Sequence, residues 1–162
     1  MPSRLAAPAP VTVRQVAVFG DRMLPFLVAV VGVDAASAAQ WATSRRLRQL
    51  PDTAAALEAA LLAQFAAAMP HGAAPEYWCP RALLVHVVAD GSGDANGGDA
   101  GAGLAAESVL PTLRRMCEWR AGGPYRTHLG KLRRGVLAAE LRDALAGAFV
   151  LAAERPLSFS CR

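Results

Sequence analysis

Pro25-Phe26-Leu27-Val28-Ala29-Val30-Val31-Gly32-Val33 is the stretch that decides the fold of this chain. From Phe26 to Val33 it is almost wholly apolar and rich in β-branched residues, and its proline stands at the start, so it predicts a strand. Another apolar run, Val11 to Phe19, precedes it and ends at Gly20-Asp21. Because the link between the two runs is short, we expect the two strands to pair antiparallel.

Two helices are predicted after these strands. Asp34 is a suitable N-cap for a helix from Ala35 to about Arg48. The chain restarts at Pro51, and a second amphipathic helix is expected to run to about Ala68. The inner face of the first helix is expected to carry Ala38, Trp41 and Ala42, and that of the second Leu57, Leu61 and Phe65.

The second half of the chain predicts one more strand and a final helix. Ala82 to Ala89 is typical of a central strand, in which His86 is expected to be a hydrogen-bonded core histidine. A short helix is expected from Ala105 to Met116, interrupted at Pro111. The final helix shows an apolar stripe at every fourth residue, namely Leu137, Leu141, Leu145 and Phe149.

Together these elements predict an α+β fold with a small three-stranded sheet, its first two strands antiparallel, packed with about three helices. We expect a flexible N-terminus at 1–10, one domain at 11–150 and a tail at 151–162, whose last residues either add an edge strand or fray. The run of Gly, Asp, Ala and Asn at 91–104 predicts a disordered insertion or a surface loop.

Composition narrows the classes of function. The chain has 162 residues, enough for one domain, and a formal net charge of +4, which permits an anionic partner without requiring one. No apolar stretch is long enough for a transmembrane segment, and no apolar signal-peptide core is visible, so we expect a soluble intracellular chain. The three cysteines lack metal-ligand spacing, and we expect no metal site. Dispersed arginines and strands without exposed aromatics disfavour nucleic-acid binding.

One stretch near the C-terminus carries chemistry: Tyr125-Arg126-Thr127-His128-Leu129-Gly130-Lys131-Leu132-Arg133-Arg134. Lys131 follows a glycine at the mouth of the final helix. Because glycine has no side chain, the backbone at Gly130 is able to pass close to a ligand. The pattern favours a single cation that reaches a phosphate or a carboxylate.

The order of these motifs resembles the C-terminal domain of long-chain acyl-CoA synthetases, in the superfamily of adenylate-forming (AMP-binding) enzymes. Residues 13–21, and residues 25–31 with Asp34, are similar to the family's pair of strands around a Gly-Asp turn, followed by a helix with a tryptophan, here Trp41. Residues 82–88 are similar to its third strand. Most specific is Thr127-His128-Leu129-Gly130-Lys131-Leu132-Arg133-Arg134, which looks like the family's last motif: a threonine, a lysine four residues later and a basic pair.

The resemblance implies a lid that closes over an N-terminal adenylating domain. It implies Lys131 as the catalytic residue, with Gly130, Arg133 and Arg134 as cofactor-binding residues. The family's substrates are fatty acid, ATP with Mg and CoA, and none is expected to bind tightly to this chain alone. The implied activity is that of an ATP-dependent long-chain fatty acid–CoA ligase, located in the cytoplasm or peripherally at a membrane surface.

This chain departs from the family in its motif and in its extent. His128 stands where the family has proline or a small residue, and Gly130 where the long-chain branch has an aromatic. The glycine- and threonine-rich phosphate loop and the hinge segment are absent from the sequence. We therefore expect a fragment, a degenerate copy or one half of a split enzyme, inactive alone. The alternative is a regulatory or protein-interaction module derived from that domain and without catalysis.

Overall fold

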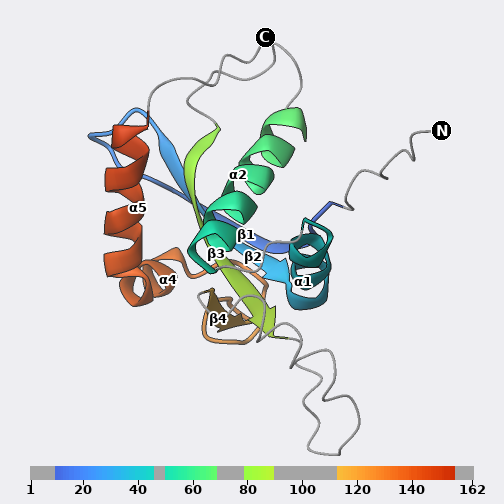
Figure 1. Cartoon of the computed structure of the whole chain (residues 1–162). Coiled ribbons are helices and arrows are strands. Elements are labelled where there is room, and N and C mark those ends of the chain that lie inside the picture. The colour runs from blue at the N-terminus through green and yellow to red at the C-terminus, as the bar shows by residue number, and fades with distance from the viewer. Residues whose placement is uncertain (1–9, 46–49, 69–78, 90–112, 156–162) are drawn as a thin grey trace, which may run out of the picture.

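The computed structural model describes residues 10–45, 50–68, 79–89 and 113–155. In this part of the chain, helices pack against a four-stranded mixed sheet (Figure 1). The elements are, in chain order, β1 (Val13–Gly20), β2 (Leu27–Asp34), α1 (Ala35–Ser44), α2 (Leu50–Ala68), β3 (Pro80–Ala89), β4 (Arg114–Cys117), α4 (Arg134–Glu140) and α5 (Arg142–Glu154). The predicted α+β class is confirmed, but the prediction of three strands is wrong.

Some of the predicted segments lie outside the described residues. These are the glycine-rich insertion at 91–104, residues 105–112 of the predicted short helix, the last residues of the tail at 156–162, and all of the N-terminus at 1–10 except its final residue. The first part of the predicted tail, 151–155, is described and belongs to α5 except for its last residue.

The sheet has the strand order β1-β2-β3-β4. β1 pairs antiparallel with β2, as the short link between the two apolar runs predicts, whereas β2 with β3 and β3 with β4 are parallel pairs. β3 therefore lies between two strands, which confirms the prediction that it is central.

The extra strand, β4, comes from residues that we expected to end a short helix, and this expectation is wrong for residues 113–116. β4 pairs with β3 from His86 to Ala89. Backbone groups of a buried strand must find hydrogen-bond partners, and β4 supplies them on this side of β3. Local sequence propensity contains no information about the hydrogen-bond partners that β3, earlier in the chain, requires from residues 114–117.

Both faces of the sheet are covered by helices, which explains the sequence of β2. Along this strand Ala29, Val31 and Val33 pack into one core with α1 and α2, whereas Val28 and Val30 pack into a second core with α4 and α5. All six residues from Val28 to Val33 are buried. A strand buried on both faces is apolar throughout and does not alternate, as this one shows.

Both N-terminal helices present the apolar faces that their spacing predicts. Asp34 caps α1 as expected, since its carboxylate accepts a hydrogen bond of 2.9 Å from the backbone N–H of Ser37. α1 is described as far as Ser44, and residues 46–49 of the predicted helix lie outside the described residues. The predicted inner faces are confirmed by the burial of Ala38, Trp41, Ala42, Leu57 and Leu61, with Phe65 partly buried beside them.

The C-terminal stripe lies in the core, but it does not belong to one helix. Leu137, Leu141 and Leu145 are buried, and Phe149 packs against them. α4 ends at Glu140, the backbone of Leu141 has a ψ of 15°, and α5 runs in a new direction from Arg142 (Figure 1). The Leu141 N–H still donates to Leu137 O and the Leu145 N–H to Leu141 O, so the every-fourth spacing survives the bend. Periodicity alone therefore cannot reveal the bend.

A β-bulge at Arg14 decides which core each side chain of β1 joins. Val13 pairs with Val33 and Gln15 with Gly32, so Arg14 is an extra residue in β1. An extra residue reverses the alternation of side chains along a strand. Val13 consequently packs against the α1 and α2 core, while Gln15 is buried on the opposite face of the sheet.

An ion pair covers the edge of β3 that β4 leaves open. The Arg155 guanidinium donates to both carboxylate oxygens of Glu58, each at 2.9 Å, and also to the Arg81 carbonyl at 2.9 Å. The same carboxylate accepts a 3.0 Å hydrogen bond from the Leu83 N–H. Glu58 thus joins α2, β3 and the end of α5.

We expect Glu58→Ala to lower the free energy of unfolding by about 2–3 kcal/mol, because it leaves the Leu83 N–H and the Arg155 guanidinium without their acceptor. Urea unfolding followed by circular dichroism measures this difference. Glu154→Ala, an exposed glutamate in α5, is the matched control and should change stability by less than about 0.5 kcal/mol. Equal effects of the two variants would contradict the role given to Glu58.

Candidate functional site

The segment around Lys131, which carries the resemblance to the last motif of acyl-CoA synthetases, folds as a tight hairpin. Its two arms meet at a bridge between Arg126 and Leu132. On either side of this bridge the Arg133 N–H donates to Tyr125 O at 2.7 Å, and the Thr127 N–H donates to Lys131 O at 2.9 Å. Residues 125–133, named here the lysine hairpin, therefore hold Lys131 opposite Thr127.

The tip of the lysine hairpin is closed by hydrogen bonds around Thr127. Its carbonyl accepts from the Gly130 N–H at 2.9 Å, and its hydroxyl accepts from the Lys131 N–H at 3.1 Å. The Arg126 guanidinium donates to the Gly130 carbonyl at 3.1 Å. Gly130 has a φ of 78°, a backbone conformation that favours glycine, so a turn requirement accounts for this residue type.

The Lys131 side chain is exposed, three residues before the first residue of α4. Among the described residues, none forms an ion pair or a hydrogen bond with its Nζ. Lysine and arginine together number seventeen in this chain, and Lys131 is the only lysine, which leaves sixteen arginines. Because an ammonium is a compact point charge and a guanidinium a planar fork, the two are not interchangeable at a site that aims one charge at one atom.

The other three predicted site residues also belong to this region. Arg133 and Arg134 are exposed at the first turn of α4, where cations gain nothing from the helix dipole. Apart from its two chain neighbours, no described residue lies within 4 Å of the place that a side-chain carbon would take at Gly130, so the hairpin is open to approach there. The structure thus brings Gly130, Lys131, Arg133 and Arg134 together on one short segment with no described acidic partner.

The root of the lysine hairpin is buried. Tyr125 packs against Trp119 with ring centroids 6.4 Å apart, and its hydroxyl donates to the Glu140 carboxylate at the end of α4. Burial, and then this hydrogen bond, raise the pKa of Tyr125 to about 12. Glu140 also lies 3.6 Å from the Arg114 guanidinium. The hairpin is therefore attached to α4 and β4 through a tyrosine that stays protonated at any physiological pH.

A second polar cluster is buried in the sheet, and the sequence predicts only part of it. Gln15 and His86 approach within 2.9 Å, from Nε2 to Nε2, across the intervening strand β2. The Gln15 amide also accepts from the backbone N–H of Trp119 at 2.9 Å and donates to the Cys117 carbonyl at 3.4 Å. His86 is thus a hydrogen-bonded core histidine, as predicted. The sequence analysis did not single out Gln15, although a glutamine within an otherwise apolar strand indicates a buried polar contact.

Gly32 makes the contact between Gln15 and His86 possible. The three residues stand side by side in the register of β1, β2 and β3. A side-chain carbon at Gly32 would lie 2.4 Å from Cγ of Gln15 and 2.7 Å from Nε2 of His86. Because Gly32 of β2 has no side chain, the side chains of Gln15 on β1 and His86 on β3 meet in the space above it.

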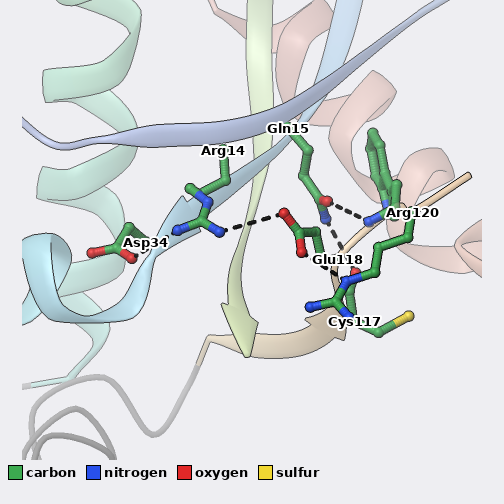
Figure 2. A network of polar contacts seen from close by, with 7 residues as sticks. Arg14, Gln15, Asp34, Cys117, Glu118 and Arg120 are labelled. Carbon is green, nitrogen blue, oxygen red and sulfur yellow. Dashed lines mark hydrogen bonds and ion pairs between the residues drawn. The ribbon is translucent and has the colours of Figure 1, made fainter. Parts of the chain in front are cut away.

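An ionic network closes over the same end of the sheet (Figure 2). Arg14 lies between Asp34 and Glu118, at 3.6 Å and 3.4 Å, and Glu118 also accepts from Arg120 at 3.0 Å. The hydrogen bond from Arg120, followed by that from Arg14, holds the pKa of Glu118 below its usual range. These contacts join the segment after β4 to β1, at the other edge of the sheet.

The buried histidine predicts a dependence of stability on pH. Burial, and then the positive charge of Arg114, lower the pKa of His86 to about 4. The unfolded chain binds a proton at this residue near pH 6.5 and the folded chain does not, so stability is fully present above pH 6.5 and falls as the pH drops toward 4. We expect a loss of about 2 kcal/mol between pH 7 and pH 5, and of about 3 kcal/mol by pH 4.

Urea unfolding at half-unit pH steps measures this loss. His86→Gln is the matched variant because it keeps a polar side chain beside Gln15 and removes the titrating group. Its stability at pH 7 should be lower, but the slope between pH 6.5 and pH 5 should shrink by about 1 kcal/mol per pH unit. An unchanged slope would contradict the assignment of this slope to His86.

Comparison with protein family models, with curated proteins and with solved structures found no match for this chain. In the described ranges, no helix has both the length and the apolar character needed to cross a bilayer. The same ranges hold no cluster of three or more His, Cys, Asp or Glu side chains suited to a metal ion. Within the described residues, the lysine hairpin presents an exposed cation on a turn whose backbone is held by hydrogen bonds.

Proposed function

We propose that this chain is the C-terminal lid domain of an ATP-dependent long-chain fatty acid–CoA ligase. In this function the lysine hairpin closes over an adenylating domain, on the same polypeptide or on another, and Lys131 reaches the reaction centre. The chain supplies a cation and a cover, while the adenylating domain binds ATP with Mg and the fatty acid.

The chemistry of adenylation requires such a cation. A carboxylate oxygen of the fatty acid attacks the α-phosphorus of ATP, the bond to the bridging oxygen breaks, and pyrophosphate leaves. Negative charge gathers on the phosphoryl oxygens in the transition state, and an ammonium positioned in a closed site stabilises it. In the second step the CoA thiol loses its proton and attacks the acyl carbonyl, and AMP leaves. Arg133 and Arg134 are then available for the phosphates of CoA.

One observation carries the proposal: the only lysine of the chain is exposed, without a described partner, on a turn whose backbone is held by hydrogen bonds. Holding the backbone of a charged residue lowers the entropy that is lost when its side chain reaches a ligand. The other sixteen Lys or Arg positions of the chain are all arginines. A lysine at the single position that matches the family's motif favours a site for which an arginine is unsuitable.

Reconstitution tests this function. An adenylating domain of a long-chain acyl-CoA synthetase from the same organism, freed of any lid of its own, is mixed with the purified chain, palmitate, ATP, Mg and CoA. Pyrophosphate, palmitoyl-AMP and palmitoyl-CoA are measured. We expect the chain to raise the rate of pyrophosphate release and of thioester formation above that of the adenylating domain alone.

Two other outcomes would overturn the proposal. Binding of the chain without any rise in rate would indicate the regulatory or protein-interaction module. If the chain neither binds the adenylating domain nor raises the rate, the proposed relation to this enzyme family is wrong altogether.

A further inference from the structure

The tip of the lysine hairpin carries an apolar side chain that the proposed chemistry does not use. Leu129 is 87% exposed, two residues before Lys131. An exposed leucine by itself is ordinary on a protein surface. This one is unusual in its position, because it lies in the turn between Thr127 and Gly130, at the tip of the segment that carries Lys131.

The backbone that presents Leu129 is held in place before any partner binds. Hydrogen bonds from the N–H groups of Gly130 and Lys131 to Thr127 close the turn around it. On the other side, the Gly122 N–H donates to the Thr127 carbonyl at 3.1 Å. A side chain on such a turn loses little further entropy on docking, so most of the gain from its burial appears as affinity.

The charges around Leu129 indicate what kind of surface receives it. The sequence has no Asp or Glu between Glu118 and Glu140, whereas this span holds five cationic residues. Among them, Lys131 and Arg133 follow the leucine by two and four residues, are exposed, and form no ion pair with any described residue. Charge complementarity therefore favours an apolar socket bordered by anionic groups.

We propose that Leu129 is the docking anchor of the lysine hairpin: it enters an apolar socket on the adenylating domain, beside the anionic reaction centre, and sets the depth that Lys131 reaches. This inference rests on the proposed function. Hydrophobic anchors in a closed pocket dominate binding energy in protein interfaces, while charged neighbours steer the approach. Leu129 accordingly acts on docking, and Lys131 on the chemical step.

The test separates docking from chemistry in the reconstituted system. The rate of palmitoyl-AMP formation is measured against the concentration of the chain, which yields a half-saturating concentration and a saturating rate. We expect Leu129→Ala to raise the half-saturating concentration roughly 10-fold to 100-fold, the effect of removing one buried leucine, and to change the saturating rate less than about threefold.

Met23→Ala is the matched control. Met23 is also 87% exposed, and it too lies on a turn closed by hydrogen bonds, between β1 and β2. Its turn carries an aspartate and an arginine instead of a cluster of cations. We expect Met23→Ala to leave the half-saturating concentration unchanged.

Competition gives a readout that does not depend on catalysis by the variant. Added in excess, Lys131→Ala should inhibit reconstitution by the wild-type chain, because it docks without reacting. The double variant Leu129→Ala, Lys131→Ala should inhibit at least tenfold more weakly.

If Lys131→Ala lowers the rate while Leu129→Ala changes neither the half-saturating concentration nor the inhibition, this result would contradict the role of Leu129 as an anchor. It would still agree with the proposed function. Equal effects of Met23→Ala and Leu129→Ala would also contradict the role of Leu129 as an anchor. No rate with the wild-type chain would overturn both proposals.

Discussion

Replacing Lys131 with alanine should lower the rate of palmitoyl-AMP formation about 100-fold to 1000-fold, the loss typical when one stabilising group is removed from a transition state. The variant should fold normally, since the Lys131 side chain is exposed and its hydrogen bonds are made by the backbone. A single-turnover assay at saturating chain concentration isolates the chemical step. Lys131→Arg should recover less than about a tenth of the rate, because a guanidinium spreads its charge over a larger plane.

The control for Lys131 is another exposed cation. Arg142, at the start of α5, is exposed and forms no ion pair with the described residues. Arg142→Ala changes the net charge by the same amount and should keep the rate within about twofold, since Arg142 lies outside the lysine hairpin and an exposed charge is largely screened by salt. Full activity of Lys131→Ala, or of Lys131→Arg, would rule out a role for the ammonium.

Replacing Gly32 with alanine should be the most damaging small change in the fold, with a loss of about 3–5 kcal/mol in the free energy of unfolding. The new carbon would lie 2.4 Å from Gln15 Cγ, 2.7 Å from His86 Nε2 and 2.7 Å from Val88 Cγ2. Overpacking of a core costs about 1–3 kcal/mol, and separating the buried pair Gln15 and His86 leaves polar groups unsatisfied at about 1–3 kcal/mol more. Urea unfolding at pH 7 measures the loss.

Gly147→Ala is the matched control for Gly32. Gly147 lies on the outer side of α5, where an added carbon meets nothing within 4 Å. Alanine favours a helix over glycine, so this variant should gain about 0.5–1 kcal/mol. The same chemical change should thus have opposite signs at the two sites. A cost below about 1 kcal/mol at Gly32 would mean that Gln15 and His86 are able to separate at little expense.

Local patterns were sufficient for the elements whose stability is decided by their own residues. The Asp34 cap, the inner face of α1 and the stripe of α2 follow from spacings within a single helix. Lys131 was predicted to lie directly before the final helix, as it does, and the glycine before it has a turn conformation. What could not be predicted is the set of hydrogen bonds that Thr127 makes, because they depend on how the chain returns on itself.

The buried cluster shows where local patterns end. Gln15 and His86 are separated by 71 positions, and the bulge at Arg14 determines that Gln15 faces His86 at all. A glutamine, a glycine and a histidine in three apolar strands become one site only when the register aligns them. Their meeting is therefore a property of strand pairing and of no single segment.

The sequence by itself determined the class of fold, the antiparallel pairing of the first two strands, the faces of the helices and the position of the one lysine. It did so because apolar spacing, caps and short links act over a few residues. Only the tertiary structure decided that residues 114–117 form a fourth strand, that the last helix bends at Leu141 and that Leu129 stands at the tip beside Lys131. These features arise from packing and hydrogen bonds between segments distant in the chain, because buried backbone N–H and C=O groups of one segment need partners on another.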